Sequence, residues 1–190
     1  MDVAPATVSL ATRACRGDDA ALNELLAELR PLVVRTTRLV VGSGSWAAED
    51  AAQEALLDIS RGITGLRDPK AVRTWALRVA VRRAIRISRR ERLLRLRNAP
   101  SAELERELEP AHGDGRDAAL KHAFDRLSPR LRATAVLRLH AGLSEQETAD
   151  ALGCSVGTVK SNLHDARRRL TRLLSEAGFA PTVEQKGELR

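Results

Sequence analysis

Apolar residues near the C-terminal end of the chain recur at helical spacing. Val156, Val159, Leu163, Ala166 and Leu170 are separated by steps of 3, 4, 3 and 4 residues, which places them on one side of an α-helix. The preceding stretch, LSEQETADALG, carries a second and shorter helical pattern. Together these segments predict a short helix, a break that contains a glycine, and a longer helix.

Start and stop signals delimit the helices in this half of the chain. Ser144 and Glu147 have the spacing of a capping box, in which each side chain hydrogen-bonds to the backbone of the other residue. Ser128 is an N-cap candidate that is followed by Pro129 at the first helical position. Gly153 stands where a helix is expected to end. Three helices are therefore predicted over residues 128–175.

The first half of the chain is also predicted to be helical, because strand patterns are nearly absent from it. Helices are expected over residues 18–41, with a break near Pro31, over residues 47–61, and from Asp68 to about residue 97. Residues 98–116 hold two prolines, two glycines and many acids, which is the composition of a flexible linker. The fold class is therefore all-α, with two small helical domains. The expected organisation is a tail (1–17), a first domain (18–97), an acidic linker (98–116), a second domain (117–175) and a C-terminal tail (176–190).

Charge is distributed unevenly along the 190 residues, whose formal net charge is +7. Residues 61–97 carry a net charge of +11 and residues 126–175 carry +5, whereas the intervening residues 98–125 carry −4. A basic balance of this kind favours a polyanionic partner. Because an acidic block separates the two basic blocks, two separate contacts with a polyanion are expected.

Cysteine usage and hydropathy exclude several classes of protein. Cys15 and Cys154 form neither a metal-type pair nor a disulfide framework. The N-terminal stretch lacks the apolar core of a signal peptide, and no run of about 18 apolar residues could cross a membrane. The four histidines have no ligand or triad spacing, and no glycine-rich phosphate loop is present. We expect a soluble cytoplasmic protein with no catalytic residue, metal, cofactor or small-molecule substrate.

The two C-terminal helices have the helix-turn-helix pattern, whose second helix enters the major groove of DNA. Opposite its apolar side the second helix carries Ser155, Thr158 and Asn162, with Lys160 and Arg168 beside them. Hydroxyl and amide groups can bond to bases or phosphates, and lysine and arginine neutralise phosphates. The alternative is a helical hairpin with a solvated basic face.

A second basic surface is predicted on the helix that runs to residue 97. Arg78, Arg82, Arg86 and Arg90 follow one another at intervals of four residues, and Trp75 lies one turn before them. A cationic helix with an aromatic side chain suits a nucleic-acid strand whose bases can unstack. Alternatively, Trp75 packs in the core and the arginines are only solvated. The same stripe is expected to be extended by Arg83 and Arg89.

The helix before this basic surface carries the opposite charge. Asp50, Glu54 and Asp58 lie at intervals of four residues, and Glu49 stands beside them. No histidine or further acid accompanies this row at metal-ligand spacing. A basic protein partner is therefore the preferred explanation of the row.

These stretches resemble a known family. WAAEDAAQEALLDISRGI and RTWALRVAVRRAIRISRR are similar to region 2 of bacterial RNA polymerase sigma factors. RLSPRLRATAVLRLHAGLSEQETADALGCSVGTVKSNLHDARRRL is similar to region 4 of the same family. The two regions, joined by a short linker without a region 3 domain, resemble the extracytoplasmic-function group (group IV) of the sigma-70 family.

The resemblance implies a role for each charged surface. It implies a transcription initiation factor that binds core RNA polymerase, recognises the −10 and −35 promoter elements and aids promoter melting. The residues that it places at the polymerase contact are Glu49, Asp50, Gln53, Glu54 and Asp58. Those at the −10 element are Thr64, Asp68, Lys70, Trp75, Arg78, Arg82 and Arg86. Those at the −35 element are Ser155, Val156, Gly157, Thr158, Lys160, Ser161, Asn162, His164, Arg167 and Arg168.

The resemblance also implies an anti-sigma factor as a second protein partner. The linker of 19 residues could extend over about 63–68 Å, which approaches two DNA turns of about 34–36 Å each. Two rival functions remain open from the residues alone. One is a helix-turn-helix regulator that binds duplex DNA without polymerase, and the other is a helical adaptor that contacts only proteins.

Overall fold

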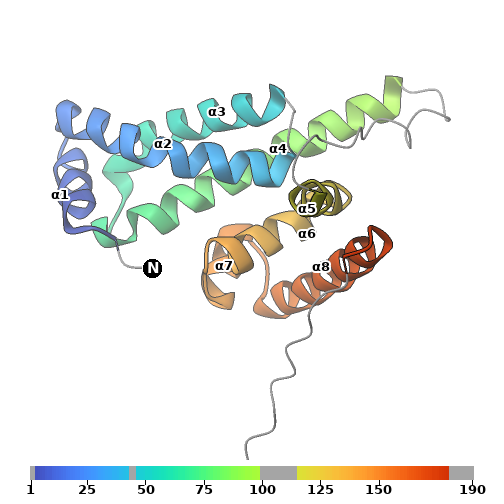
Figure 1. The fold of residues 1–190 in the computed structure, drawn as a ribbon. Coiled ribbons are helices and arrows are strands. Elements are labelled where there is room, and N and C mark those ends of the chain that lie inside the picture. Colours follow the sequence, from blue (N-terminus) through green and yellow to red (C-terminus); the bar gives the residue numbers. More distant parts are fainter. Residues whose placement is uncertain (1–2, 43–45, 99–114, 180–190) are drawn as a thin grey trace, which may run out of the picture.

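The computed structural model describes residues 3–42, 46–98 and 115–179, and all the regular elements in these ranges are helices. The predicted all-α fold class is confirmed (Figure 1). Among the described residues, the first helices are α1 (Pro5–Ala14), α2 (Asp19–Val41), α3 (Trp46–Gly62) and α4 (Val72–Asn98). Helix α5 (Gly115–Asp125) begins the second half of the chain. It is followed by α6 (Pro129–Ala135), a π-helical turn η3 (Val136–His140), α7 (Glu145–Leu152) and α8 (Val156–Glu176). Two short 3-10 turns, η1 (Ile63–Gly65) and η2 (Pro69–Ala71), connect α3 to α4.

Helices α2, α3 and α4 pack against one another, and α1 lies across one end of α2 (Figure 1). The prediction of a tail over residues 1–17 was wrong, because these residues contain α1. Pro5 occupies the start of this helix, and Ala11 and Ala14 are buried in the same hydrophobic cluster as Leu25 of α2. The small apolar residues at helical spacing were the signal that could have revealed this helix.

Helix α2 runs without a break through Pro31, so the predicted helix pair at 18–41 was also wrong. Leu25, Leu29, Val33 and Val40 are all buried along one side of the helix, whereas Pro31 is exposed. A proline inside a helix costs a hydrogen bond and creates a steric conflict with the preceding turn. Burial of this apolar side outweighs that local cost.

The predicted helix starts and stops in the second half are confirmed. The Ser144 hydroxyl accepts a hydrogen bond from the Glu147 N–H at 3.1 Å, and the Ser144 N–H donates to the Glu147 carboxylate at 2.8 Å, which completes the capping box. Ser128 caps α6. Gly153 ends α7 in the left-handed conformation, with φ of 61°, which costs glycine little.

Helix α4 ends at Asn98, close to the predicted end near residue 97. Helix α5, for which the sequence analysis predicted no separate helix, begins at Gly115, so both ends of the range 98–116 are helical. The remaining linker residues, 99–114, lie outside the described residues. So do residues 43–45 and the end of the predicted C-terminal tail, 180–190.

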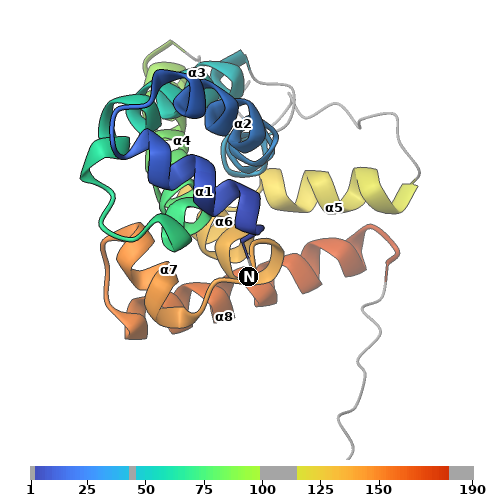
Figure 2. The same ribbon diagram turned by 90° about the vertical axis from the view of Figure 1, so that its left-hand side faces the viewer.

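The two halves of the chain share a hydrophobic cluster. Val40 of α2 and Val81 of α4 belong to it together with Val136 and Leu137 of η3 and Ala151 of α7. Helix α6 contacts both α2 and α4, and α7 contacts α4. Figure 2 shows α6 and α7 placed directly beside the first helical bundle. The two halves are therefore packed together in this structure.

Candidate functional site

Helix α8 presents the predicted −35 residues on its solvent side. Val159, Leu163, Ala166 and Leu170 are buried against the rest of the second half, so the apolar side predicted from the sequence is confirmed. Most of the candidate DNA-binding residues are exposed, namely Ser155, Gly157, Thr158, Lys160, Ser161, His164, Arg167 and Arg168. The other two, Val156 and Asn162, are half-buried, and the Nδ2 atom of Asn162 is buried.

The N-terminal end of α8 is held by its own hydroxyl groups. The Ser155 side chain accepts a hydrogen bond from the Thr158 N–H at 3.1 Å and lies 2.9 Å from the Thr158 hydroxyl. Lys160 lies 3.5 Å from a Glu145 carboxylate oxygen of α7. Because both partners of that ion pair are substantially exposed, the pair contributes little energy. The N-terminal end of α8 is therefore held in place by its own cap.

The arginine stripe that the sequence predicted on α4 is largely exposed, and one of its members also contacts α7. Arg82, Arg86 and Arg90 are exposed, and Arg78 is half-buried. Arg82 donates hydrogen bonds at 3.1 Å to the carbonyl oxygens of Asp150 and Ala151, at the end of α7. The expected extension of the stripe by Arg83 was wrong, because this side chain faces α3.

The turns before α4 display further −10 candidates. Thr64, Asp68 and Lys70 are exposed, and the Asp68 carboxylate accepts a hydrogen bond from the Lys70 N–H at 3.0 Å. Trp75 is half-buried and packs against the hydrophobic cluster that contains Ala11 and Leu25. A Cβ atom added to Gly62 would lie 3.1 Å from its ring. The indole therefore packs against the core while part of the side chain remains exposed.

The acidic row on α3 is divided between two neighbouring helices. Arg83 of α4 donates to Glu54 at 2.9 Å and to Asp58 at 2.7 Å, and it makes a second, shorter bond to Asp58. Hydrogen bonding to Asp58 raises the pKa of the Arg83 guanidinium above its ordinary value. On the other side, Glu49 pairs with Arg38 of α2. Asp50 and Gln53 are exposed.

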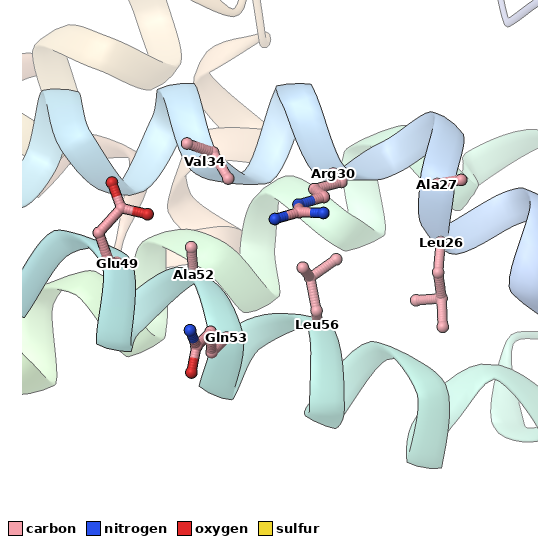
Figure 3. Close-up of a pocket in the computed structure, with 8 residues that line it drawn as sticks. All are labelled: Leu26, Ala27, Arg30, Val34, Glu49, Ala52, Gln53 and Leu56. Atoms are coloured by element: carbon pink, nitrogen blue, oxygen red, sulfur yellow. The ribbon is translucent and has the colours of Figure 1, made fainter.

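An open groove of about 340 Å³ lies between α2 and α3 (Figure 3). Glu49 and Gln53, two of the predicted polymerase-binding residues, line it from α3. Figure 3 shows Arg30 of α2 and Leu56 of α3 projecting into the space between the helices. The groove thus combines apolar walls with both signs of charge, and sequence periodicity did not reveal the contribution of α2. Its complete lining is Leu26, Ala27, Arg30, Val34, Glu49, Ala52, Gln53 and Leu56.

Within residues 3–42, 46–98 and 115–179, no group of three or more His, Cys, Asp or Glu side chains converges as a metal site. In the same ranges, no helix combines the length and the apolar character needed to cross a membrane.

Comparison with known protein families matches two parts of the chain. Residues 25–93 match the model of sigma-70 region 2, and residues 117–170 match the model of sigma-70 region 4. The chain is 34% identical over 161 residues to the ECF RNA polymerase sigma factor SigM of Mycobacterium tuberculosis H37Rv, which covers 83% of this chain and 79% of SigM. It is 29% identical over 180 residues to the ECF RNA polymerase sigma factor SigD of Mycobacterium bovis, covering 90% of this chain and 84% of SigD.

Two solved structures share the fold. One is the sigma factor RpoE in complex with the anti-sigma factor NepR from Bartonella quintana, with a TM-score of 0.64 and 24% identity over 80% of this chain and 96% of RpoE. The other is CnrH in complex with the cytosolic domain of CnrY, with a TM-score of 0.64 and 23% identity over 90% of this chain and 98% of the matched chain.

Proposed function

Because the chain belongs to the extracytoplasmic-function (ECF) sigma factors of the sigma-70 family, we propose that it binds core RNA polymerase, directs it to specific promoters and aids promoter melting. The observation that carries this proposal is the presence of both promoter-reading regions in one chain, each with a basic helix. RNA synthesis belongs to the polymerase, so no catalytic step is assigned to this chain. Its proposed place of action is the cytoplasm, where polymerase and DNA are found.

In this proposal α8 reads the −35 element from the major groove. Its exposed hydroxyl-bearing residues, Ser155, Thr158 and Ser161, would meet base edges near the N-terminal end of the helix. Arg167 and Arg168, further along α8, are exposed and would contact phosphates. The separation of these two groups along one helix supports base recognition at one end and electrostatic anchoring at the other.

Helix α4 and the turns before it are the proposed reader of the −10 element. Arg86 and Arg82 would hold the phosphates of the melted strand, and the partly exposed ring of Trp75 would stack on an unpaired base. A base that leaves the stack needs a pocket, and the exposed Thr64, Asp68 and Lys70 stand at the adjacent turns.

The polymerase contact is proposed on α3 and on the groove between α2 and α3. Exposed Asp50 and Gln53, together with Glu49 at the groove, would meet a basic surface of the polymerase. Glu54 and Asp58 would act differently, since Arg83 already pairs with both. Their proposed contribution is to hold α3 in position on α4. An anti-sigma factor is a further proposed partner, because it would have to cover these same surfaces to prevent initiation.

In vitro transcription tests the proposed function. Core RNA polymerase is incubated with genomic fragments in the presence and absence of the protein, and the transcripts are sequenced. Discrete transcripts that depend on the protein are expected, and their upstream sequences will identify both promoter elements. If no such transcripts appear while the protein alone binds duplex DNA tightly, the chain is instead a helix-turn-helix regulator that acts without polymerase.

A charge reversal tests the polymerase contact separately. Asp50→Lys places a positive charge on the proposed docking face, and we expect it to weaken binding to core polymerase by about tenfold or more. Asp117→Lys changes an exposed acid on α5 in the same way and serves as the matched control. Equal affinities of the two variants, measured by fluorescence anisotropy of labelled protein, would remove Asp50 from the interface.

A further inference from the structure

Helix α1 lies against the segment that leads into the proposed −10 reader. Figure 1 places α1 at the end of the bundle where α3 passes into α4, and α1 contacts both η1 and η2. Residues 62–71, called the −10 turn below, contain these two short turns and expose Thr64 and Asp68. A short exposed segment has few contacts of its own, so its conformation depends on the neighbours that hold it.

The contact between α1 and the −10 turn includes hydrogen bonds from a cysteine. Cys15 directly follows α1, and its thiol donates to the carbonyl oxygen of Ile63 with a sulfur-to-oxygen distance of 3.2 Å. The same sulfur lies 3.8 Å from the carbonyl oxygen of Leu66. The Ile63 carbonyl also accepts the Leu66 N–H at 3.0 Å. One side chain outside the −10 turn therefore reaches the backbone at the start of η1 and just after its end.

The thiol can make these contacts only while it keeps its proton, because a thiolate has no hydrogen to donate. Burial raises the pKa of Cys15 above its ordinary value, so the protonated form prevails at neutral pH. A raised pKa also makes a thiol a poor nucleophile. The chemistry of Cys15 therefore suits a hydrogen-bond donor and not a reactive thiol.

Helix α1 is in turn fixed to the helical bundle. Thr7 is 1% exposed, and its hydroxyl donates a hydrogen bond to the Glu28 carboxylate of α2. Ala11 and Ala14 are buried in the same hydrophobic cluster as residues of α2, α3 and α4, and Cys15 packs against this cluster. The position of the sulfur atom is therefore set by the bundle, and α1 connects α2 to the −10 turn.

The cluster also connects Cys15 with the proposed stacking side chain. Leu66 and Trp75 both pack against it. Gly62, the first residue of the −10 turn, lies close to the indole, because a Cβ atom added there would be 3.1 Å from the ring. A shift of the −10 turn would therefore change both the surroundings of Trp75 and the positions of Thr64 and Asp68.

We propose that helix α1 holds the −10 turn in its reading conformation, and that Cys15 is the positioning residue through which it does so. Cys15 acts through the backbone of the turn and does not itself touch DNA. The consequence for promoter opening rests on the proposed function, whereas the effect of Cys15 on the turn does not.

Hydrogen–deuterium exchange of the full chain tests the effect on the turn. Cys15→Ala and Cys15→Ser remove the same sulfur atom, but the serine hydroxyl can still donate to a carbonyl oxygen. In Cys15→Ala, we expect the peptide covering residues 62–71 to exchange about threefold or more faster than in the unaltered chain. Cys15→Ser should restore at least half of the lost protection. Cys154→Ala removes the other half-buried thiol and is the matched control, which should leave this peptide unchanged.

The exchange experiment can overturn the proposal in two ways. One is equal exchange of this peptide in Cys15→Ala and the unaltered chain. The other is an equal increase in Cys15→Ala and Cys15→Ser, which would assign the effect to the lost bulk and not to the hydrogen bond. Far-UV circular dichroism verifies that Cys15→Ala keeps its helix content. If it does not, Thr7→Val decides, because it preserves shape, removes the bond to Glu28 and should increase exchange in the same peptide.

Permanganate footprinting tests the functional consequence, because permanganate oxidises unpaired thymines. On promoters found by in vitro transcription, holoenzyme with Cys15→Ala should show about threefold or more weaker thymine reactivity in the −10 element, since fewer molecules hold the turn in the competent conformation. Cys15→Ser should recover the reactivity. Affinities for core polymerase and for a −35 duplex should not change, which separates positioning of the turn from a general loss of stability.

The outcomes separate this proposal from the proposed function. Unchanged thymine reactivity in Cys15→Ala would overturn the proposed positioning role, even though the unaltered chain supports transcription. If the unaltered chain yields no transcripts, the proposed function fails, and the exchange experiment by itself decides whether α1 holds the turn through Cys15.

Discussion

Arginines with similar sequence surroundings have different roles in this structure. Arg82 and Arg83 are neighbours on α4, yet Arg82 caps α7 whereas Arg83 pairs with the acids of α3. Arg132 is buried between the two halves of the chain, while Arg168 is exposed on α8. At the residue scale, the function of each cation therefore depends on the surface that it faces.

The exposed arginines of α8 allow a direct test of DNA contact. Arg168→Ala should weaken binding to a −35 duplex and reduce the slope of log affinity against log salt concentration by about one, because one phosphate contact is lost. Arg172→Ala changes an exposed arginine one turn further along, which pairs with Glu176, and should leave the slope unchanged. Fluorescence anisotropy over a range of salt concentrations measures both slopes, and equal slopes for the two variants would remove Arg168 from the phosphate contact.

Gly42 is the residue at which backbone conformation and domain contact coincide. Its φ is +119°, and an added Cβ atom would lie 3.0 Å from the Asp125 carboxylate and 3.1 Å from Nη1 of Arg132. We expect Gly42→Ala to lower the free energy of unfolding by about 1–3 kcal/mol. Gly65→Ala is the control, because no atom lies within 4 Å of its added Cβ. Urea unfolding followed by circular dichroism compares them, and an equal loss in both variants would contradict this role for Gly42.

At the scale of the helices, local sequence signals predicted some features correctly, whereas tertiary packing decided others. The cap of α7 forms as the sequence predicted, because Ser144 and Glu147 are only three residues apart. The continuity of α2 through Pro31 was not predictable in this way, since it depends on burial against other helices. Helix α1 was missed because its short apolar pattern gains stability mainly from contact with α2.

The capping box gives the prediction at this scale. Ser144→Ala removes the hydroxyl that accepts the Glu147 N–H and should destabilise region 4 by about 1 kcal/mol. Ser9→Ala replaces an exposed serine within α1 and should change stability by no more than about 0.5 kcal/mol. Thermal unfolding, followed by the far-UV circular dichroism of the helices, compares the two variants. Equal stability of the two would show that the cap contributes nothing measurable.

At the scale of the whole molecule, two family regions behave as one packed body. The shared cluster joins α2 and α4 to η3 and α7. Arg132 also donates to the carbonyl oxygen of Val40, which lies 92 residues earlier in the sequence. A common apolar cluster couples the stability of the parts that it joins. The two matched regions should therefore not unfold independently.

Scanning calorimetry tests this coupling. The unaltered chain should show one heat-absorption peak, because unfolding either half exposes the shared cluster. Arg132→Met should lower the temperature of this peak, because it removes the hydrogen bonds to the end of α2, whereas Arg86→Ala should leave the peak unchanged. Two resolved peaks in the unaltered chain would show that the contact between the halves is too weak to couple them.

The sequence by itself determined the all-α fold class, the caps of α6 and α7 and the apolar side of α8. These features depend on residues within a few positions of one another, where helical geometry relates spacing directly to structure. The family resemblance, carried by the same local motifs, was confirmed by the matches to both sigma-70 regions. The individual site residues assigned from it remain predictions.

Only the tertiary structure decided which charged groups are available to a partner. Glu54 and Asp58 have the same four-residue spacing as Asp50, yet Arg83 engages the first two. Arg82 belongs to the predicted DNA-binding stripe but is bonded to α7. The physical reason is that hydrogen bonds and ion pairs between helices depend on how those helices pack. That packing is set by burial over the whole chain, and no local spacing specifies it.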